Sequence, residues 1–221
     1  GGLLAGGLFI GGRIKGIKRA CLAVSLPSLT DEITLLMDSG ANMDCKAEML
    51  YEFALMGKVF LENVMNVNNP KISLLNVGLE EHKGNKLTKE TYGLLKESDL
   101  NFIGNIESRD LFTSKSNIIL ADGFDGNIAL KTAEGVLKLF GKELKNILYK
   151  SSKNKIAGAL IKNDLKNLTE KFSADEVGGA PLLGVKSYVY KAHGNANETA
   201  FSNGILGLMD YIDKDVISKI E

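Results

Sequence analysis

The sequence predicts an α/β fold in which helices cover both faces of a largely parallel sheet. Short apolar runs that end in turn residues alternate along the 221 residues with longer segments whose apolar residues recur every three or four positions. This order of strands and helices is typical of a parallel sheet flanked by helices. Because the chain contains no internal repeat and no low-complexity linker, we expect a single domain over residues 1–221.

In the first part of the chain, apolar composition and spacing predict two helices and three strands. Residues 1–12 are apolar and glycine-rich and predict a buried helix. Apolar residues from Leu50 to Val64 recur at three-to-four spacing, which predicts a helix over 46–66. Short apolar runs bounded by turn residues predict strands, and these are 20–26, 33–38 and 71–77.

The second part of the chain continues the alternation. Thr88 is a suitable N-cap for a helix over 88–97. A long helix is expected from about Gly126, and a basic amphipathic helix is expected over 155–172. The remaining predicted elements are strands at 101–105, 117–121 and 187–192 and a helix over 198–220.

Composition and charge exclude several classes of protein. Hydrophobic residues make up 44% and charged residues 24% of the chain, as in ordinary globular proteins. The formal net charge is zero, so we expect no nucleic acid as a partner. Of the 27 basic residues only Arg13, Arg19 and Arg109 are arginines, so few sites can use a bidentate guanidinium. No apolar run approaches the roughly 18 residues of a membrane-spanning helix.

The cysteines and the first residues bear on the cell compartment and on the extent of the chain. Cys21 and Cys45 have no metal-ligand spacing and form no CxxC pair, which favours a reduced, cytosolic protein with no metal site. The chain opens on Gly1 inside an apolar stretch that lacks the pattern of a signal peptide. We therefore expect that an N-terminal segment precedes these residues in the natural protein.

Four polar, glycine-containing loops follow predicted strands. They are DSGAN at 38–42, GLEEHKGN at 78–85, DGFDGN at 122–127 and KAHGNAN at 191–197. In α/β folds, ligands bind beyond the carboxyl ends of the strands, so these loops are the candidate binding site. The candidate residues in and beside them are Asp38, Asn42, Lys83, Asn85, Asp122, Gly126, Asn127, Lys131 and His193.

The residue types in these loops indicate an anion as ligand. Asn127 and Lys131 are four residues apart and therefore share one face of the helix that the third loop opens. A helix N-terminus offers free N–H groups and a partial positive charge. Lys83 adds a cation in a glycine-flanked loop. Together these features favour an anion-binding α/β enzyme.

A structural role is the alternative for each of these residues. Asp38 and Asp122 could be helix or turn caps, Lys83 and Lys131 could be solvated surface charges, and His193 could be a hydrogen-bonded loop residue. The chain lacks GxGxxG after a strand and the GxxxxGK[ST] phosphate loop, so neither dinucleotide nor nucleoside triphosphate binding is indicated. It also lacks the GxSxG motif of many hydrolases.

At these loops the sequence resembles the PlsX family, the bacterial acyl-ACP:phosphate acyltransferases of phospholipid synthesis. The matching stretches follow the family's order and cover nearly the whole chain. They are LLAGGLFIGGRIKGIKRA, LLMDSGANMDCKAEML, LLNVGLEEHKGNKLTKETY, NFIGNIESRDL, LADGFDGNIALKTAEG, GGAPLLG and YKAHGNAN. The family's glycine motif begins a few residues before this chain does, which agrees with a missing N-terminal segment.

The resemblance implies a Rossmann-like α/β/α sandwich, similar to phosphotransacetylases and isocitrate-dehydrogenase-like proteins, that works as a homodimer. It implies transfer of a fatty acyl group from acyl carrier protein (ACP) to inorganic phosphate, with no metal or organic cofactor. Phosphate is itself a nucleophile, so such an enzyme needs to position two reactants and stabilise an oxyanion. Lys83, Asn127 and Lys131 are the expected catalytic residues; the expected phosphate- and substrate-binding residues are Asp38, Asn42, Asn85, Asp122, Gly126 and His193.

Two further segments are expected to contact partners. ACPs are acidic, and a basic cluster after the first apolar stretch could bind one; it comprises Arg13, Lys15, Lys18 and Arg19. A helical excursion is expected at 142–172 as a dimer contact or as a weak contact with the membrane surface. The predicted location is therefore the cytoplasm, with peripheral association at the inner face of the membrane.

Other functions stay open at the level of sequence. A phosphotransacetylase-like enzyme would use acyl-CoA as the donor, and a non-catalytic scaffold would bind acyl-ACP at the membrane without turnover. A decarboxylating dehydrogenase of related fold would need a carboxylate cluster and substrate arginines, which this chain supplies poorly. Cys45 could in principle carry the acyl group, although cysteine is common as a small buried residue.

Overall fold

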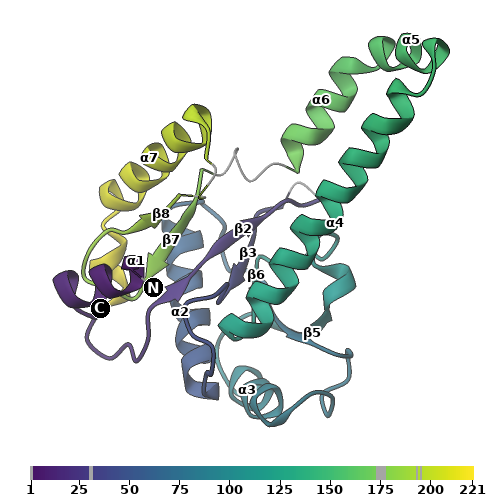
Figure 1. Cartoon of the computed structure of the whole chain (residues 1–221). Helices are drawn as coiled ribbons and strands as arrows, with labels where there is room; N and C mark the ends of the chain where they lie inside the picture. The colour runs from purple at the N-terminus through teal and green to yellow at the C-terminus, as the bar shows by residue number, and fades with distance from the viewer. Residues whose placement is uncertain (1, 30–31, 173–177, 193, 195) are drawn as a thin grey trace.

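A five-stranded sheet forms the centre of the molecule. The computed structural model describes residues 2–29, 32–172, 178–192, 194 and 196–221 (Figure 1). In the sheet, the order is β2-β3-β6-β4-β5, and the last four strands are parallel to one another. The strands are β2 (Val24–Leu26), β3 (Thr34–Met37), β4 (Ile72–Asn76), β5 (Phe102–Glu107) and β6 (Ile118–Leu120). The predicted α/β class with a largely parallel sheet is confirmed.

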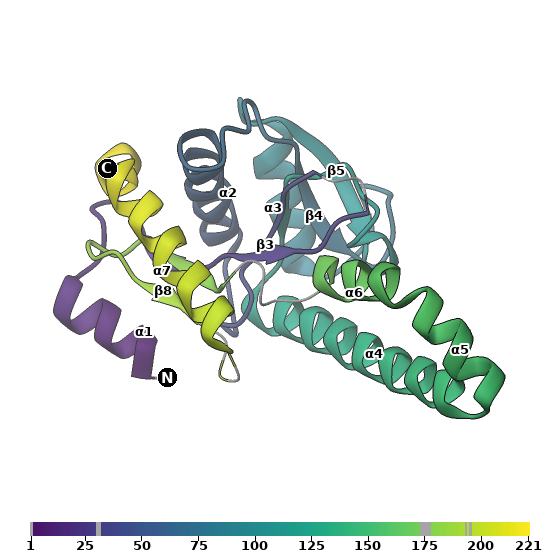
Figure 2. The same ribbon diagram turned by 90° about the horizontal axis from the view of Figure 1, so that it is seen from above.

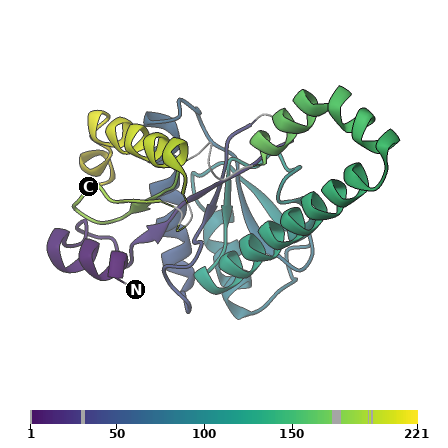
Figure 3. The same cartoon turned by 45° about the horizontal axis from the view of Figure 1, so that its top comes forward.

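Alternating side chains of the central strands pack on helices at both faces of this sheet. Leu35 and Ile118 belong to a cluster with α2 (Ala47–Asn63), whereas Leu36 and Ile119 belong to the opposite cluster, which α4 (Gly123–Tyr149) covers with its first turns. Because successive side chains of a strand point to opposite faces, purely apolar strands are buried on both sides. Full burial of each such side chain contributes about 1.5–3 kcal/mol. Figure 3 shows the resulting α/β/α layers.

A second, three-stranded antiparallel sheet lies beside the first, in the order β1-β7-β8. Its strands are β1 (Cys21–Leu22), β7 (Ala180–Leu183) and β8 (Tyr190–Lys191). The prediction of one strand over 20–26 is wrong, because the chain leaves the small sheet at Ala23 and enters the large sheet as β2. The Ala23 N–H donates to the carbonyl of Pro181 at 3.1 Å, which holds the two sheets together.

Near the small sheet, the chain begins and ends in helices. These are α1 (Gly2–Gly6), a π-helix (Gly7–Gly11), α7 (Glu198–Asp213) and α8 (Val216–Ile220). The predicted buried helix over 1–12 is wrong in part, because Phe9 and Ile10 are each 89% exposed. The helix predicted over 198–220 is divided at Asp215, which adopts a left-handed backbone conformation.

Several other boundaries differ from the prediction for local reasons. The helix α3 (Lys86–Lys96) begins before Thr88, because Asn85 is its N-cap and accepts from the Thr88 N–H at 2.9 Å. Helix α4 begins at Gly123 and has Asp122 as its N-cap. A short 3₁₀ helix (Ser108–Asp110) follows β5.

The second half of α4 forms an arm together with α5 (Ser152–Leu160) and α6 (Lys162–Lys171), and Figure 2 shows the arm extending beyond the sheet. The single helix predicted over 155–172 is wrong, because the chain breaks at Ile161. At the turn into α5, the Asn154 side-chain amide donates to the carbonyl of Ile147 at 2.7 Å and so caps the end of α4. No helix among the described residues is long and apolar enough to cross a membrane.

Candidate functional site

Three of the four predicted loops meet at one edge of the large sheet. Because β3, β6 and β4 are adjacent and parallel, the loops that follow them leave the sheet at the same side. The fourth loop follows β8 of the small sheet, and His193 in that loop lies outside the described residues. The loops at 38–42, 78–85 and 122–127 therefore share one edge of the sheet, and ligand binding there stays a prediction.

Asp38 is the centre of the loop after β3. Its side chain is fully buried and its two oxygens accept hydrogen bonds from the backbone N–H groups of Leu22, Ala41 and Asn42 and from the side-chain amide of Asn42, at 2.7–3.1 Å. Burial raises the pKa of the Asp38 carboxyl, while these hydrogen bonds oppose the rise. With its oxygens occupied in this way, Asp38 organises the loop and connects it to β1.

The loops after β3 and β6 touch backbone to backbone. The Gly123 N–H donates to the carbonyl of Asn42 at 2.7 Å. At Gly126, a Cβ atom would lie 2.0 Å from the carbonyl oxygen of Asp38. Only glycine allows this approach, which also brings Asn127 beside Gly40, where an added Cβ would lie 3.5 Å from the Asn127 side-chain oxygen.

The first turn of α4 carries the other predicted anion-binding groups. The Asp122 carboxylate caps the helix by accepting from the Asp125 N–H at 2.8 Å. Burial, and secondly the charge of Asp122, raise the pKa of the Asp125 carboxyl. Asn127 is half-buried in this turn. One turn later, the Lys131 ammonium is paired with both carboxylate oxygens of Glu134, at 2.8 and 2.9 Å.

Lys83 lies in a small pocket of about 340 Å³ at the end of β4. Its side chain passes over Gly78, where an added Cβ would be 3.2 Å from the Lys83 Cγ. The pocket is lined by Val77, Gly78, Leu79, Glu80, Lys83 and Glu107. Two strand asparagines fix the loop: Asn76 donates to the carbonyl of Lys83 at 3.2 Å, and Asn105 donates to the carbonyl of Glu80 at 2.9 Å. Asn85, the N-cap of α3, closes the loop.

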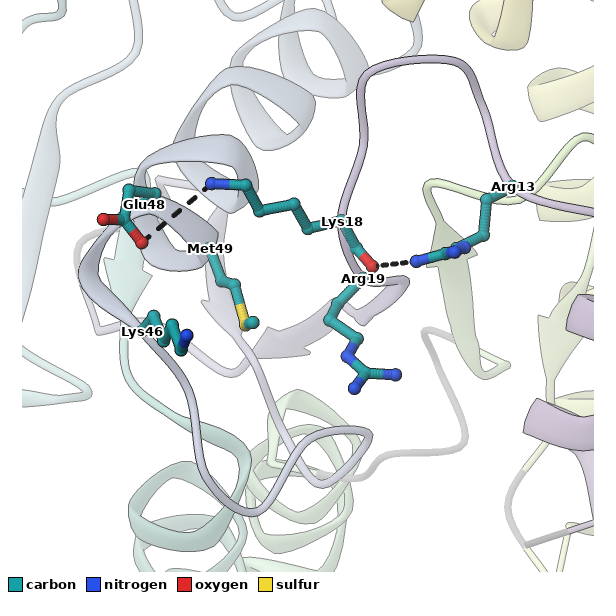
Figure 4. A pocket seen from close by; sticks show the side chains of 6 residues that line it. All are labelled: Arg13, Lys18, Arg19, Lys46, Glu48 and Met49. Carbon is teal, nitrogen blue, oxygen red and sulfur yellow. Dashed lines mark hydrogen bonds and ion pairs between the residues drawn. The ribbon is translucent and has the colours of Figure 1, made fainter.

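A larger, basic pocket of about 560 Å³ lies beside the loop after β3 (Figure 4). It is lined by Arg13, Lys18, Arg19, Lys46, Glu48 and Met49. Three members of the predicted basic cluster thus share one pocket, whereas Lys15 is exposed but does not line it. Lys46 was not predicted as a site residue. Its signal in the sequence is its unusual position: it is a cation directly before the first turn of a helix, where acidic residues are normally favoured.

Cys45 is poorly suited to covalent chemistry. It is buried, with 7% of its surface exposed, and its thiol lies 3.8 Å from the carbonyl oxygen of Asn42. Burial raises its pKa to about 12, and the charge of Asp38 adds to the rise. A reactive cysteine needs a lowered pKa and access to its substrate. Cys45 therefore serves as a packing residue of the loop after β3.

The protein has an α/β fold of the kind found in phosphotransacetylases. A phosphotransacetylase from Streptococcus pyogenes superposes with a TM-score of 0.56 and 18% identity over 94% of this chain and 58% of its own. The EutD phosphotransacetylase from Staphylococcus aureus gives a TM-score of 0.51 and 14% identity, over 92% of this chain and 58% of its own. At these identities the likeness concerns the fold alone.

The sequence defines the family more narrowly. A family model described as "Fatty acid synthesis protein" matches residues 1–219, and the chain belongs to this family, the PlsX family. Relatives named "Phosphate acyltransferase" are 48% identical in Clostridium botulinum and 46% identical in Thermoanaerobacterium thermosaccharolyticum, each over all 221 residues. The chain spans 66% of the length of each of these two relatives.

Proposed function

We propose that this protein transfers a fatty acyl group from acyl-ACP to inorganic phosphate and so supplies acyl phosphate for phospholipid synthesis. The observation that carries the proposal is the 48% identity, over the whole chain, to a relative named phosphate acyltransferase. The site gives independent support, because polar loops converge at the end of a parallel sheet, where such folds bind ligands.

In the proposed reaction, a phosphate oxygen attacks the thioester carbonyl carbon. A C–O bond forms and the carbonyl oxygen becomes an oxyanion; the C–S bond then breaks, and the thiolate leaves and takes up a proton. The protein must hold the two reactants in line and stabilise the oxyanion. We infer that Lys83 and Asn127 supply these contacts, with Lys131 and Asn85 in support. Lys131 would have to exchange its Glu134 partner for the ligand.

The remaining loop residues have a positioning role in this proposal. The Asp38 carboxylate holds the backbone of Asn42, and the Asp122 carboxylate orients the first turn of α4. Gly126 allows the two loops to approach each other. Substrate binding by Asn42 and by His193 stays a prediction.

We also propose how the protein meets its partners. The basic residues Arg13, Lys15, Lys18 and Arg19 would attract the acidic surface of ACP, an interaction that high salt should weaken. The arm exposes apolar side chains on α4 at Val136, Leu139, Phe140 and Ile147, all of them at least 56% exposed. Such a surface supports a homodimer contact there, and the tip supports weak association with the inner face of the cytoplasmic membrane.

The experiment is an assay of the full-length protein with radiolabelled phosphate and either acyl-ACP or acyl-CoA. The proposal requires labelled acyl phosphate from acyl-ACP, at a higher kcat/KM than from acyl-CoA. Preference for acyl-CoA would indicate a phosphotransacetylase-like donor specificity. Binding of acyl-ACP without any acyl phosphate would indicate a scaffold.

A further inference from the structure

The basic pocket between the segment 13–19 and the start of α2 contains more cationic charge than its own contacts neutralise. Four of its six lining residues are cationic and one is anionic; the four cations are Arg13, Lys18, Arg19 and Lys46. Its volume of about 560 Å³ falls within the range of small-molecule binding sites. Pockets of one sign of charge concentrate ligands of the opposite sign.

Lys18 and Arg13 are used to build the pocket. The Lys18 N–H donates to the Glu52 carboxylate at 2.7 Å, and the Lys18 ammonium lies 3.8 Å from Glu52 and 3.9 Å from Glu48. Arg13 donates to the carbonyl of Lys18. These contacts fix the segment before β1 against α2, and Figure 4 shows the Lys18–Glu48 pair and the bond from Arg13.

Arg19 and Lys46 remain available for a ligand. Neither side chain has a hydrogen-bond or ion-pair partner among the residues that the structure describes. Lys46 stands at the N-cap of α2 and makes no side-chain capping bond. A cation at this end of a helix is repelled by the helix dipole, so its position costs stability unless an anion occupies the pocket.

The pocket connects directly to the proposed site of transfer. Arg19 is followed by Ala20, whose carbonyl accepts from the side-chain amide of Asn42 at 2.7 Å. Lys46 lies a few residues after Asn42, between the loop that follows β3 and helix α2. A ligand held by Arg19 and Lys46 therefore lies against the loop that Asp38 organises.

We propose that Arg19 and Lys46 bind a phosphoester on the thiol arm of the acyl donor. This inference rests on the proposed function, because a carrier-bound thioester ends in a phosphopantetheine arm whose phosphate is distant from the sulfur. The pocket is larger than a single tetrahedral ion requires. Its size therefore favours a phosphate that carries a chain as the occupant, rather than the free acceptor phosphate. In this proposal, the phosphopantetheine chain extends from this pocket past Asn42 to the thioester at the proposed site of transfer.

The test compares two donors that differ in one phosphate, acyl-phosphopantetheine and acyl-pantetheine, on the full-length protein. Arg19→Ala and Lys46→Ala should each raise KM for acyl-phosphopantetheine by about tenfold or more, since each removes one charge-assisted hydrogen bond. KM for acyl-pantetheine and KM for inorganic phosphate should stay unchanged. Arg19→Lys should recover part of the loss, and Lys219→Ala on α8, where the side chain is exposed, is the matched control.

The outcomes separate this inference from the proposed function. An equal rise in KM for both donors, or a rise confined to inorganic phosphate, would overturn the assignment. Calorimetric binding of phosphopantetheine itself gives a readout without turnover. Suppose that the wild-type protein binds phosphopantetheine but forms no acyl phosphate, and that the Arg19→Ala variant does not bind phosphopantetheine. The proposed transfer reaction is then wrong and the pocket assignment stands. If transfer occurs and phosphopantetheine binding is equal in wild type and Arg19→Ala, the pocket assignment alone is wrong.

Discussion

Asp38 shows how a polar residue of a candidate binding loop can have its hydrogen-bonding capacity used within the protein. Its position after a strand made it a candidate for phosphate binding or for a cap, and the structure gives it hydrogen bonds from three backbone N–H groups and one side-chain amide. Burial raises the pKa of this carboxyl, and the hydrogen bonds oppose the rise. These same bonds define the shape of the loop after β3.

At Lys83 and Asn127, we predict a loss of catalysis without a loss of fold. Lys83 is exposed and Asn127 is half-buried, so alanine at either position should leave the thermal midpoint nearly unchanged. If they stabilise the oxyanion, Lys83→Ala and Asn127→Ala should each lower kcat by about 100-fold. Steady-state assays beside thermal melts check both statements. Folded variants with near-normal kcat would remove these residues from the mechanism.

At Cys45, we predict full activity of Cys45→Ala and resistance of the native thiol to alkylation at pH 8. The pKa of about 12 lies above the ordinary thiol value of 9.0, so the folded state binds this proton more tightly. The contribution of the Cys45 thiol to the free energy of unfolding is therefore fully present below pH 9 and is lost as pH rises from 9 towards 12. Urea unfolding of wild type and Cys45→Ala between pH 8 and 11 should show a shallower alkaline decline in the variant. Rapid alkylation with loss of turnover would restore the acyl-carrier hypothesis.

At the scale of elements, α4 joins the site to the arm, and its glycines differ in purpose. Gly126 packs on the backbone of Asp38, whereas Gly135 and Gly141 have open space around them. Gly126→Ala should destabilise the protein by about 1–3 kcal/mol through overpacking. Gly135→Ala should stabilise it by about 0.5–1 kcal/mol, because glycine is a poor helix former. Denaturant titrations measure both, and equal effects at the two positions would contradict the proposed contact between the loops.

Local chemistry explains which elements could be predicted from the sequence. Strands β3, β4 and β6 are apolar on both faces and end in turn residues, and the loops that follow them were found for the same reason. Strand β7 was missed because Pro181 and its flanking glycines are typical of loops, although the strand pairs in a small sheet. The break at Ile161 has no proline as a signal, and Gly158, three residues before it, lies against Leu148 of α4.

The site was predictable in its loops but not in its pocket. Lys46 and Arg19 are 27 positions apart in the sequence, and contacts such as the bond from Asn42 to Ala20 and the anchoring of Lys18 by Glu52 bring them together. Such long-range contacts leave no periodic signal. Of the predicted cluster, Arg13, Lys18 and Arg19 line one pocket together with Lys46, and ACP binding there stays a prediction.

At the scale of the whole molecule, the arm is the surface most suited to a lipid contact. The break at Ile161 divides the predicted amphipathic stripe, so Ile156 and Leu160 lie on α5, at the end of the arm in Figure 1, and Leu168 lies on α6. Ile156 is 64% and Leu160 is 81% exposed. Lys155 and Lys162 flank them, and each Lys near an anionic leaflet contributes about 1 kcal/mol.

We predict that the full-length protein pellets with anionic vesicles at low salt, and that binding falls as salt rises. The double variant Ile156→Asp with Leu160→Asp should lose this binding, because two carboxylates replace the apolar contact and oppose the leaflet charge. Ile103→Asp, on the exposed edge strand β5, is the control and should pellet like wild type. Sedimentation velocity on the same samples separates lipid contact from subunit contact. A double variant that still pellets would assign the tip to protein packing, and one that becomes monomeric would place the dimer interface there.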